Sequence, residues 1–126
     1  MQPAMSKKIL VVDDSSSVRR QVQMALSEGG FTVLEAGDGL EGANMIDRHR
    51  DLALVICDVN MPLMNGLDLL EQVKAKPEHA ALPIVMLTTE GKPALIQQAK
   101  RAGAKGWVIK PFKPHLLTIA VQKLTA

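Results

Sequence analysis

Five short apolar runs alternate along the chain with five amphipathic stretches, and this alternation limits the possible folds more than any other feature. The runs are near-continuous blocks rich in valine, isoleucine and leucine, which is typical of strands buried on both faces in parallel sheets. They are Ile9–Val12, Phe31–Ala36, Leu52–Cys57, Ile84–Leu87 and Trp107–Ile109. The pattern therefore predicts five strands with a helix after each.

The stretches between the runs carry apolar residues at helical spacing. Val18, Val22 and Leu26 recur every four residues, and Leu117, Val121 and Leu124 form a similar stripe near the end. Further helices are expected within 38–50, 67–74 and 95–102. Strands that alternate with helices predict a doubly wound (βα)5 domain of the α/β class, with a parallel sheet and helices on both faces.

Length and composition indicate a single domain of ordinary globular character. With 126 residues and 47% hydrophobic residues, the chain can bury a core without disulfides, and its single cysteine excludes a disulfide framework. No apolar run approaches the roughly 20 residues that cross a bilayer, and the N-terminus lacks a signal-like apolar segment. We therefore expect a cytoplasmic protein with a loose tail at residues 1–6, one domain at residues 7–126 and no further output domain.

Charge is distributed unevenly along the chain. The net charge of +2 is too small for a general nucleic-acid binder, but residues 91–126 carry seven basic side chains and no acidic one. Residues 1–90 carry eight basic and thirteen acidic side chains. The C-terminal part is a candidate surface for an acidic partner, although an ordinary solvated face explains the same charges equally well.

Polar side chains follow four of the five predicted strands. Asp13 and Asp14 follow the first strand and Asp58 the third, while Thr88 and Lys110 follow the fourth and fifth. In the strand order 2-1-3-4-5, the first and third strands are neighbours about 5 Å apart, so the three carboxylates converge. Such a cluster needs a compensating cation, and Mg²⁺ prefers this kind of ligand. With Lys110 and Thr88 beside it, the set suits a phosphoryl group on a carboxylate.

Each of these residues also has a simpler interpretation. Asp13 and Asp14 could cap the following helix, Asp58 could be a turn residue, Thr88 a strand residue and Lys110 a surface lysine. Capping is our interpretation of the serines at 15–17, and packing that of Cys57. His49, His79 and His115 are interpreted as surface residues because none ends a strand.

Four ordered motifs indicate a family. They are VVDD at 11–14, DVNMPLMNG at 58–66, LTTEG at 87–91 and KPF at 110–112, and the likeness extends from Lys7 to Leu124. With these motifs the chain resembles the response-regulator receiver domains of two-component systems, most of all those that stand alone in chemotaxis. The resemblance implies the strand order 2-1-3-4-5 and a signalling protein that catalyses only its own phosphotransfer and dephosphorylation.

The resemblance also implies a role for each matched residue. Asp58 would accept a phosphoryl group from a phosphohistidine of a sensor histidine kinase, and Thr88 and Lys110 would contact that group. The Mg²⁺ ligands (Mn²⁺ being possible) would be Asp13, Asp14, Asp58 and the backbone carbonyl of Asn60. A cis peptide bond before Pro111 would orient the lysine, and Trp107 would turn inward on activation. Two residues depart from the family pattern, since Trp107 replaces a tyrosine or phenylalanine and Thr89 a smaller residue.

Output would depend on another protein. The family commonly docks through its fourth helix, fifth strand and fifth helix, and this basic face would fit an acidic segment of the flagellar motor switch or of the kinase. We expect a monomer without nucleic-acid or membrane partners. A phosphorelay intermediate, a phosphate sink and an aspartate-nucleophile phosphatase are the alternatives. The phosphatase would need an Asp where Asn60 stands, and a flavodoxin-like flavin binder would need more aromatic residues.

Overall fold

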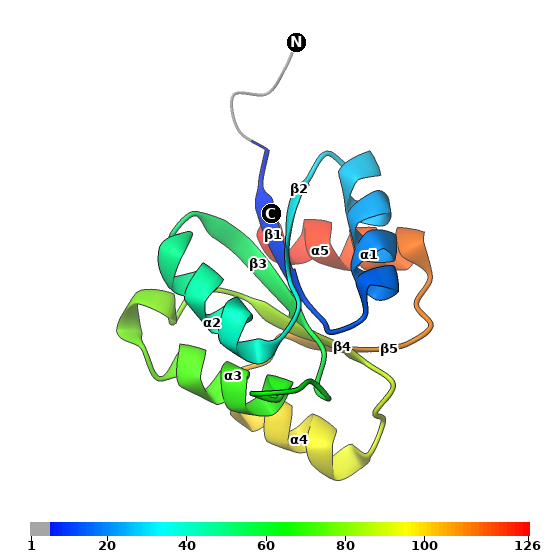
Figure 1. Cartoon of the computed structure of the whole chain (residues 1–126). Helices are drawn as coiled ribbons and strands as arrows, with labels where there is room; N and C mark the ends of the chain where they lie inside the picture. Colours follow the sequence, from blue (N-terminus) through cyan, green and yellow to red (C-terminus); the bar gives the residue numbers. More distant parts are fainter. Residues whose placement is uncertain (1–5) are drawn as a thin grey trace.

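Five parallel strands form one sheet in the order β2-β1-β3-β4-β5, as predicted (Figure 1). The structure is a computed structural model that describes residues 6–126, so the predicted tail lies outside the described residues except for Ser6. The strands are β1 (Lys8–Val12), β2 (Thr32–Ala36), β3 (Leu52–Cys57), β4 (Ile84–Thr88) and β5 (Gly106–Ile109). Each begins and ends within one residue of the predicted apolar run.

The helices begin at residues that suit helix starts. They are α1 (Ser16–Glu28), α2 (Gly39–Arg48), α3 (Gly66–Lys74), α4 (Pro93–Arg101) and α5 (Pro114–Thr125). Side chains of Ser15, Asp38 and Asn65 accept a backbone N–H at the starts of α1, α2 and α3. Helices α4 and α5 instead begin with proline, whose fixed φ suits the first turn. Among residues 6–126, no helix is long and apolar enough to cross a membrane.

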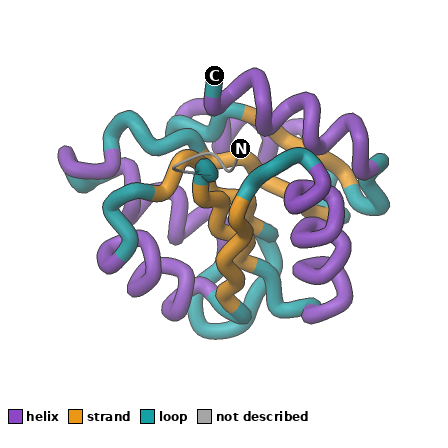
Figure 2. Tube along the Cα trace, turned by 90° about the horizontal axis from the view of Figure 1, so that it is seen from above, coloured by secondary structure: helices purple, strands orange, loops and turns teal. Residues whose placement is uncertain are grey.

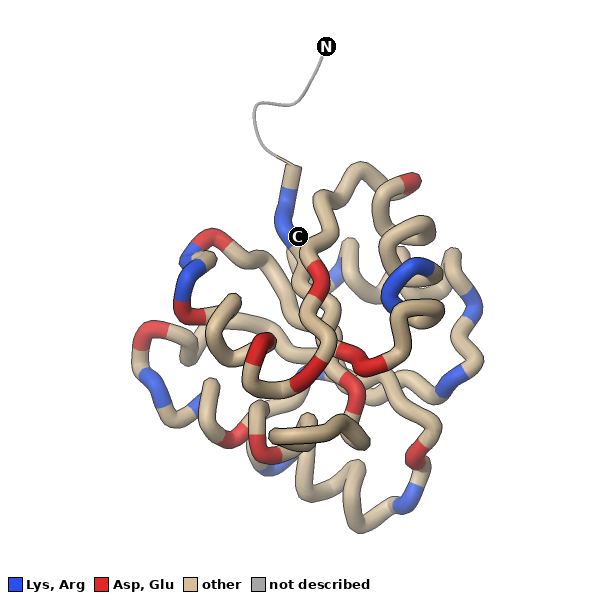
Figure 3. The backbone as a smooth tube through the Cα atoms, viewed as in Figure 1, with Lys and Arg blue, Asp and Glu red and all other residues tan. Residues whose placement is uncertain are grey.

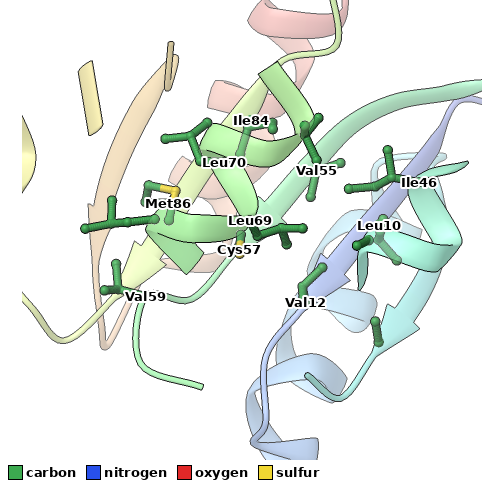
Figure 4. Close-up of a cluster of buried hydrophobic side chains, with 14 of the residues drawn as sticks. Leu10, Val12, Ile46, Val55, Cys57, Val59, Leu69, Leu70, Ile84 and Met86 are labelled. Atoms are coloured by element: carbon green, nitrogen blue, oxygen red, sulfur yellow. The ribbon is translucent and has the colours of Figure 1, made fainter. Parts of the chain in front are cut away.

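The helices cover both faces of the sheet (Figure 2). Alternate strand residues point to opposite faces, so Leu10 and Val12 pack under α2, α3 and α4, whereas Ile9 and Val11 pack under α1 and α5. Figure 4 shows the first of these two clusters, with Leu69 and Leu70 of α3 beside the sheet. The sheet therefore separates two hydrophobic cores.

A short 3-10 helix, η1 (Pro77–His79), precedes β4 and was not predicted. It places His79 in the interior with only 5% of its surface exposed, so the interpretation of His79 as a surface residue was wrong. Its Nε2 lies 3.0 Å from a carboxylate oxygen of Asp47 on α2. This polar partner is what makes burial of the imidazole acceptable.

The strand register brings the carboxyl ends of the strands to one edge. Val12 of β1 is level with Cys57 of β3. The amide of Asp58 extends this ladder by donating to the Val12 carbonyl at 2.9 Å. Between β4 and β5, the Lys110 amide likewise extends the ladder by donating to the Thr88 carbonyl, also at 2.9 Å. The polar residues that follow the strands therefore share this edge.

Candidate functional site

Asp13 and Asp14 lie in the turn between β1 and α1, but in different environments. Asp13 is buried with 1% of its surface exposed, whereas Asp14 is exposed. One oxygen of Asp13, Oδ1, accepts the backbone N–H of Ser15 at 2.9 Å. Ser15 in turn accepts the N–H of Val18 at 3.3 Å and caps α1, as predicted. Neither aspartate is therefore the helix cap, and both carboxylates lie at this edge of the sheet.

Asp58 follows β3 and is also buried, with 7% of its surface exposed. Its Oδ1 accepts the backbone N–H of Val59 at 2.7 Å. The start of α3 passes close to the same residue, and a Cβ added at Gly66 would lie 1.9 Å from the Asp58 carbonyl oxygen. Only glycine fits there, so the LMNG turn determines how α3 and Asp58 pack together.

Lys110 reaches both buried carboxylates from the end of β5. Its Nζ donates to Oδ2 of Asp13 at 2.7 Å and to Oδ2 of Asp58 at 3.3 Å. Its ammonium is mostly enclosed, with a side-chain exposure of 14%. The peptide bond between Lys110 and Pro111 is cis, as the resemblance implied. Interpreting Lys110 as a free surface lysine is therefore wrong.

The pKa values of the ion-paired groups reflect burial opposed by charge. Burial raises the pKa of Asp13, and the charge of Asp58 acts in the same direction, while Lys110 and the Ser15 amide lower it. Burial alone would lower the pKa of Lys110, but its hydrogen bond to Asp13 and the charges of Asp13 and Asp58 outweigh burial and raise it. The ammonium therefore stays charged between the two carboxylates.

The three carboxylates form the one cluster of metal-ligating side chains found within residues 6–126. Asp13, Asp14 and Asp58 each offer an oxygen atom, and these atoms lie within 4.8 Å of one another. Figure 3 shows the acidic segments close together where β1 leads into α1 and where β3 ends. Because Lys110 supplies one positive charge to three carboxylates, the donor set fits a hard divalent cation.

Thr88, Glu90 and Trp107 are linked by hydrogen bonds beside this cluster. Thr88 is fully buried, and its hydroxyl accepts the backbone N–H of Glu90 at 3.3 Å. The indole N–H of Trp107 donates to the Glu90 carbonyl at 2.8 Å. The Glu90 side chain accepts the Asn60 amide at 3.3 Å. Residue 90 thus connects the loops after β3 and β4 with β5.

Two residues at the site were not singled out from the sequence. Glu90 belongs to the LTTEG motif, but no motif gave it a role. Arg19 lies one turn into α1, and its Nη1 donates to the Asp13 carbonyl at 2.6 Å. Its position four residues after a helix cap is the sole sequence signal, and many arginines share it.

A family model for the response regulator receiver domain matches residues 9–122. The chain is 45% identical over 111 residues to the chemotaxis protein CheY1 of Helicobacter pylori strain J99. This alignment covers 87% of this chain and 90% of that protein. The chain is 41% identical over 118 residues to the chemotaxis protein CheY-3 of Vibrio cholerae, covering 93% and 90% of the two chains.

Solved structures show the same likeness in three dimensions. The chemotaxis response regulator CheY4 of Vibrio cholerae superposes with a TM-score of 0.88 at 38% identity, covering 95% of this chain and 99% of that one. A putative response regulator from Chloroflexus aurantiacus gives a TM-score of 0.89 at 30% identity, covering 96% and 98%. On the motifs, the strand order, the acidic cluster and these matches, the chain belongs to the family of response regulator receiver domains.

Proposed function

We propose that the chain is a phosphorylation-dependent switch in which Asp58 accepts a phosphoryl group from a phosphohistidine of a sensor histidine kinase. The observation that carries this proposal is the ammonium of Lys110 between Asp13 and Asp58, with a third carboxylate within 4.8 Å. An ammonium and a carboxylate cluster around one buried nucleophile suit the transfer of a charged group.

In the transfer, an Asp58 oxygen forms a bond to phosphorus while the bond from phosphorus to the donor imidazole breaks. The imidazole leaves with the electron pair and takes up a proton. Bound Mg²⁺ would neutralise charge on the carboxylates and phosphoryl oxygens, held by Asp13, Asp14, Asp58 and the Asn60 backbone carbonyl. Lys110 would follow the new negative charge by exchanging its contact with the Asp58 carboxylate for one with the phosphoryl group.

Transmission of the signal would start at Thr88. Its hydroxyl accepts the Glu90 N–H, and the Glu90 carbonyl accepts the Trp107 indole. A Thr88 hydroxyl that turns to donate to a phosphoryl oxygen changes its contact with Glu90, and the Glu90 peptide carries the change to Trp107. The indole N–H already donates to the Glu90 carbonyl in its partly buried position, so an inward turn must keep or replace this hydrogen bond.

The docking surface would be the basic face of α4, β5 and α5. Its exposed cations are Lys92, Lys100, Arg101, Lys105, Lys113 and Lys123, and no acidic residue lies beyond Glu90. Exposed Ile109 and Leu116 give the same face apolar contacts. The similarity to chemotaxis proteins favours a kinase and an acidic flagellar motor segment as partners, in the cytoplasm, rather than a phosphate sink or phosphorelay intermediate.

Phosphorylation of purified protein tests the assignment of Asp58. With phosphoramidate and Mg²⁺, the parent should gain one acid-stable, base-labile phosphoryl group, measured by intact mass. Asp58→Asn should gain none, whereas Asp68→Asn, an exposed aspartate on α3, should be labelled like the parent. Full labelling of Asp58→Asn would show that another residue is the acceptor.

Fluorescence tests the proposed role of Trp107, which is the only tryptophan of a chain without tyrosine. Beryllofluoride with Mg²⁺, a mimic of the phosphoryl group, should shift or quench its emission in the parent and not in Asp58→Asn. An unchanged spectrum in a parent that still binds its target would instead make Trp107 a fixed docking residue.

Lys110→Ala should remain phosphorylatable but fail to bind the target, since it lacks the ammonium that senses the phosphoryl group.

A further inference from the structure

Arg19 of α1 holds the backbone of the acidic turn. Its Nη1 donates to the carbonyl oxygen of Asp13 at 2.6 Å, and its Nε donates to a carboxylate oxygen of Glu35 on β2 at 2.9 Å. The arginine side chain is largely enclosed, with 19% of its surface exposed. A guanidinium has a rigid fork of donors, so these two contacts set the position of the group.

The carbonyl that Arg19 contacts belongs to the peptide that joins Asp13 to Asp14. Other contacts hold the rest of Asp13, because its N–H donates to the Ala36 carbonyl at 3.1 Å and its side chain contacts Ser15 and Lys110. The Asp14 side chain is exposed and has no hydrogen bond or ion pair among those described within residues 6–126. The direction in which Asp14 leaves the backbone therefore depends on the orientation of the 13–14 peptide.

The positive charge of Arg19, taken by itself, would weaken the binding of a cation at the three carboxylates. A positive group near three carboxylates repels a metal ion, so its removal should strengthen metal binding. Glu35 pairs with the guanidinium at 2.9 Å and offsets much of this repulsion. Loss of the hydrogen bond from Arg19 to the Asp13 carbonyl should weaken metal binding, whereas loss of the positive charge should strengthen it. The same substitution therefore separates the two effects by the sign of the change in metal affinity.

We propose that Arg19 is a positioning residue for divalent-cation binding, which holds the Asp13–Asp14 peptide so that the Asp14 carboxylate faces Asp13 and Asp58. This inference rests on the proposed function. Arg19 acts through the backbone and touches neither the cation nor the phosphoryl group. Substitution of such an indirect contact at a metal site weakens metal affinity by about 10-fold or more.

Magnesium titration by calorimetry, without any phosphoryl donor, tests this role. Arg19→Met should bind Mg²⁺ about 10-fold more weakly than the parent. Arg19→Lys should fall between them, because a lysine keeps the charge but lacks the fork. The matched control is Arg20→Met, which removes the same charge from an exposed neighbouring position and should stay within about twofold of the parent.

Unfolding of each variant without Mg²⁺ shows whether it is folded. If Arg19→Met does not fold, the comparison of Arg19→Lys with the parent carries the test, since charge alone predicts no difference between them. Parent-like or tighter binding by a folded Arg19→Met, or parent-like binding by Arg19→Lys, overturns the positioning role. Absence of Mg²⁺ binding by the parent is a different result, which overturns the proposed metal site itself.

Discussion

At the scale of single residues, Leu63 stands out in the loop between Asp58 and α3. Within residues 6–126 it is the one non-glycine residue with a positive φ, at 70°, and 74% of its surface is exposed. A left-handed conformation strains a leucine by about 1–2 kcal/mol, while asparagine adopts it more readily. The side chain buries little that could offset this strain.

We expect Leu63→Asn to raise the free energy of unfolding by about 1 kcal/mol, measured by urea denaturation. Leu63→Ala is the control, because alanine also disfavours a positive φ and should leave the stability close to that of the parent. Equal gains in both variants would attribute the effect to the loss of an exposed apolar side chain and not to the backbone.

Asp47 is the residue whose ion pairs should appear in the pH dependence of stability. The hydrogen bond from His79, and then that from Lys76, lowers the pKa of Asp47 below its ordinary 3.8. A carboxylate with a lowered folded-state pKa stabilises the protein above its unfolded-state pKa, and this contribution is lost as the pH falls through the folded-state pKa.

Asp47→Asn should therefore lower the free energy of unfolding at about pH 5, and its difference from the parent should shrink below about pH 3.8. Chemical denaturation across this range measures the difference. Glu78→Gln, an exposed neighbour outside the ion pairs described in residues 6–126, should show no such pH dependence. A difference between Asp47→Asn and the parent that does not vary with pH would contradict the role of ionised Asp47.

At the scale of elements, the contact between α3 and the end of β3 depends on Gly66. An alanine there would place its Cβ 1.9 Å from the Asp58 carbonyl oxygen, and backbone atoms cannot yield cheaply. We expect Gly66→Ala to destabilise the protein by about 2 kcal/mol or more, measured by thermal unfolding. Gly91→Ala, whose Cβ would come no closer than 3.5 Å to its neighbours, should be nearly neutral. Comparable melting temperatures for the two variants would contradict the close approach.

The strands and long helices could be predicted because each has its own local signal. Buried parallel strands form continuous apolar runs, and helices repeat their apolar face every three to four residues. Helix η1 has no such period, since a single 3-10 turn is too short to show one. The prediction for His79 was wrong because its burial depends on a partner on α2 that is 32 residues away in the sequence.

The candidate site could be predicted in its residues but not in all its contacts. These residues lie at the ends of strands or directly after them, and a parallel sheet brings such positions together without further information: Asp13, Asp14, Asp58, Thr88 and Lys110. The hydrogen bonds that Arg19 and the Trp107 indole donate end at backbone carbonyls, those of Asp13 and Glu90. A carbonyl carries no sequence signature, so contacts of this kind become visible only in the folded chain.

At the scale of the whole molecule, the protection of backbone amides from hydrogen exchange should fall from the centre of the sheet to its edge. Strands β1 and β3 pair on both sides and are almost fully buried. Strand β5 has four residues, none of them buried, and pairs with β4 alone. Hydrogen exchange should therefore be slowest for Leu10 and Val55, whose opening approaches global unfolding, and much faster for Val108. Equal protection in β1 and β5 would mean that the sheet opens only as one unit.

The contact between Lys110 and Asp13 has a consequence for how the molecule assembles. These residues are 97 positions apart, so their ion pair encloses most of the chain in one loop. In a partly folded chain in which β1 and β3 have paired but β5 has not docked, the carboxylates of Asp13 and Asp58 repel each other without the lysine between them. Lys110 therefore lessens the repulsion between Asp13 and Asp58 only in a chain whose fifth strand has joined the sheet.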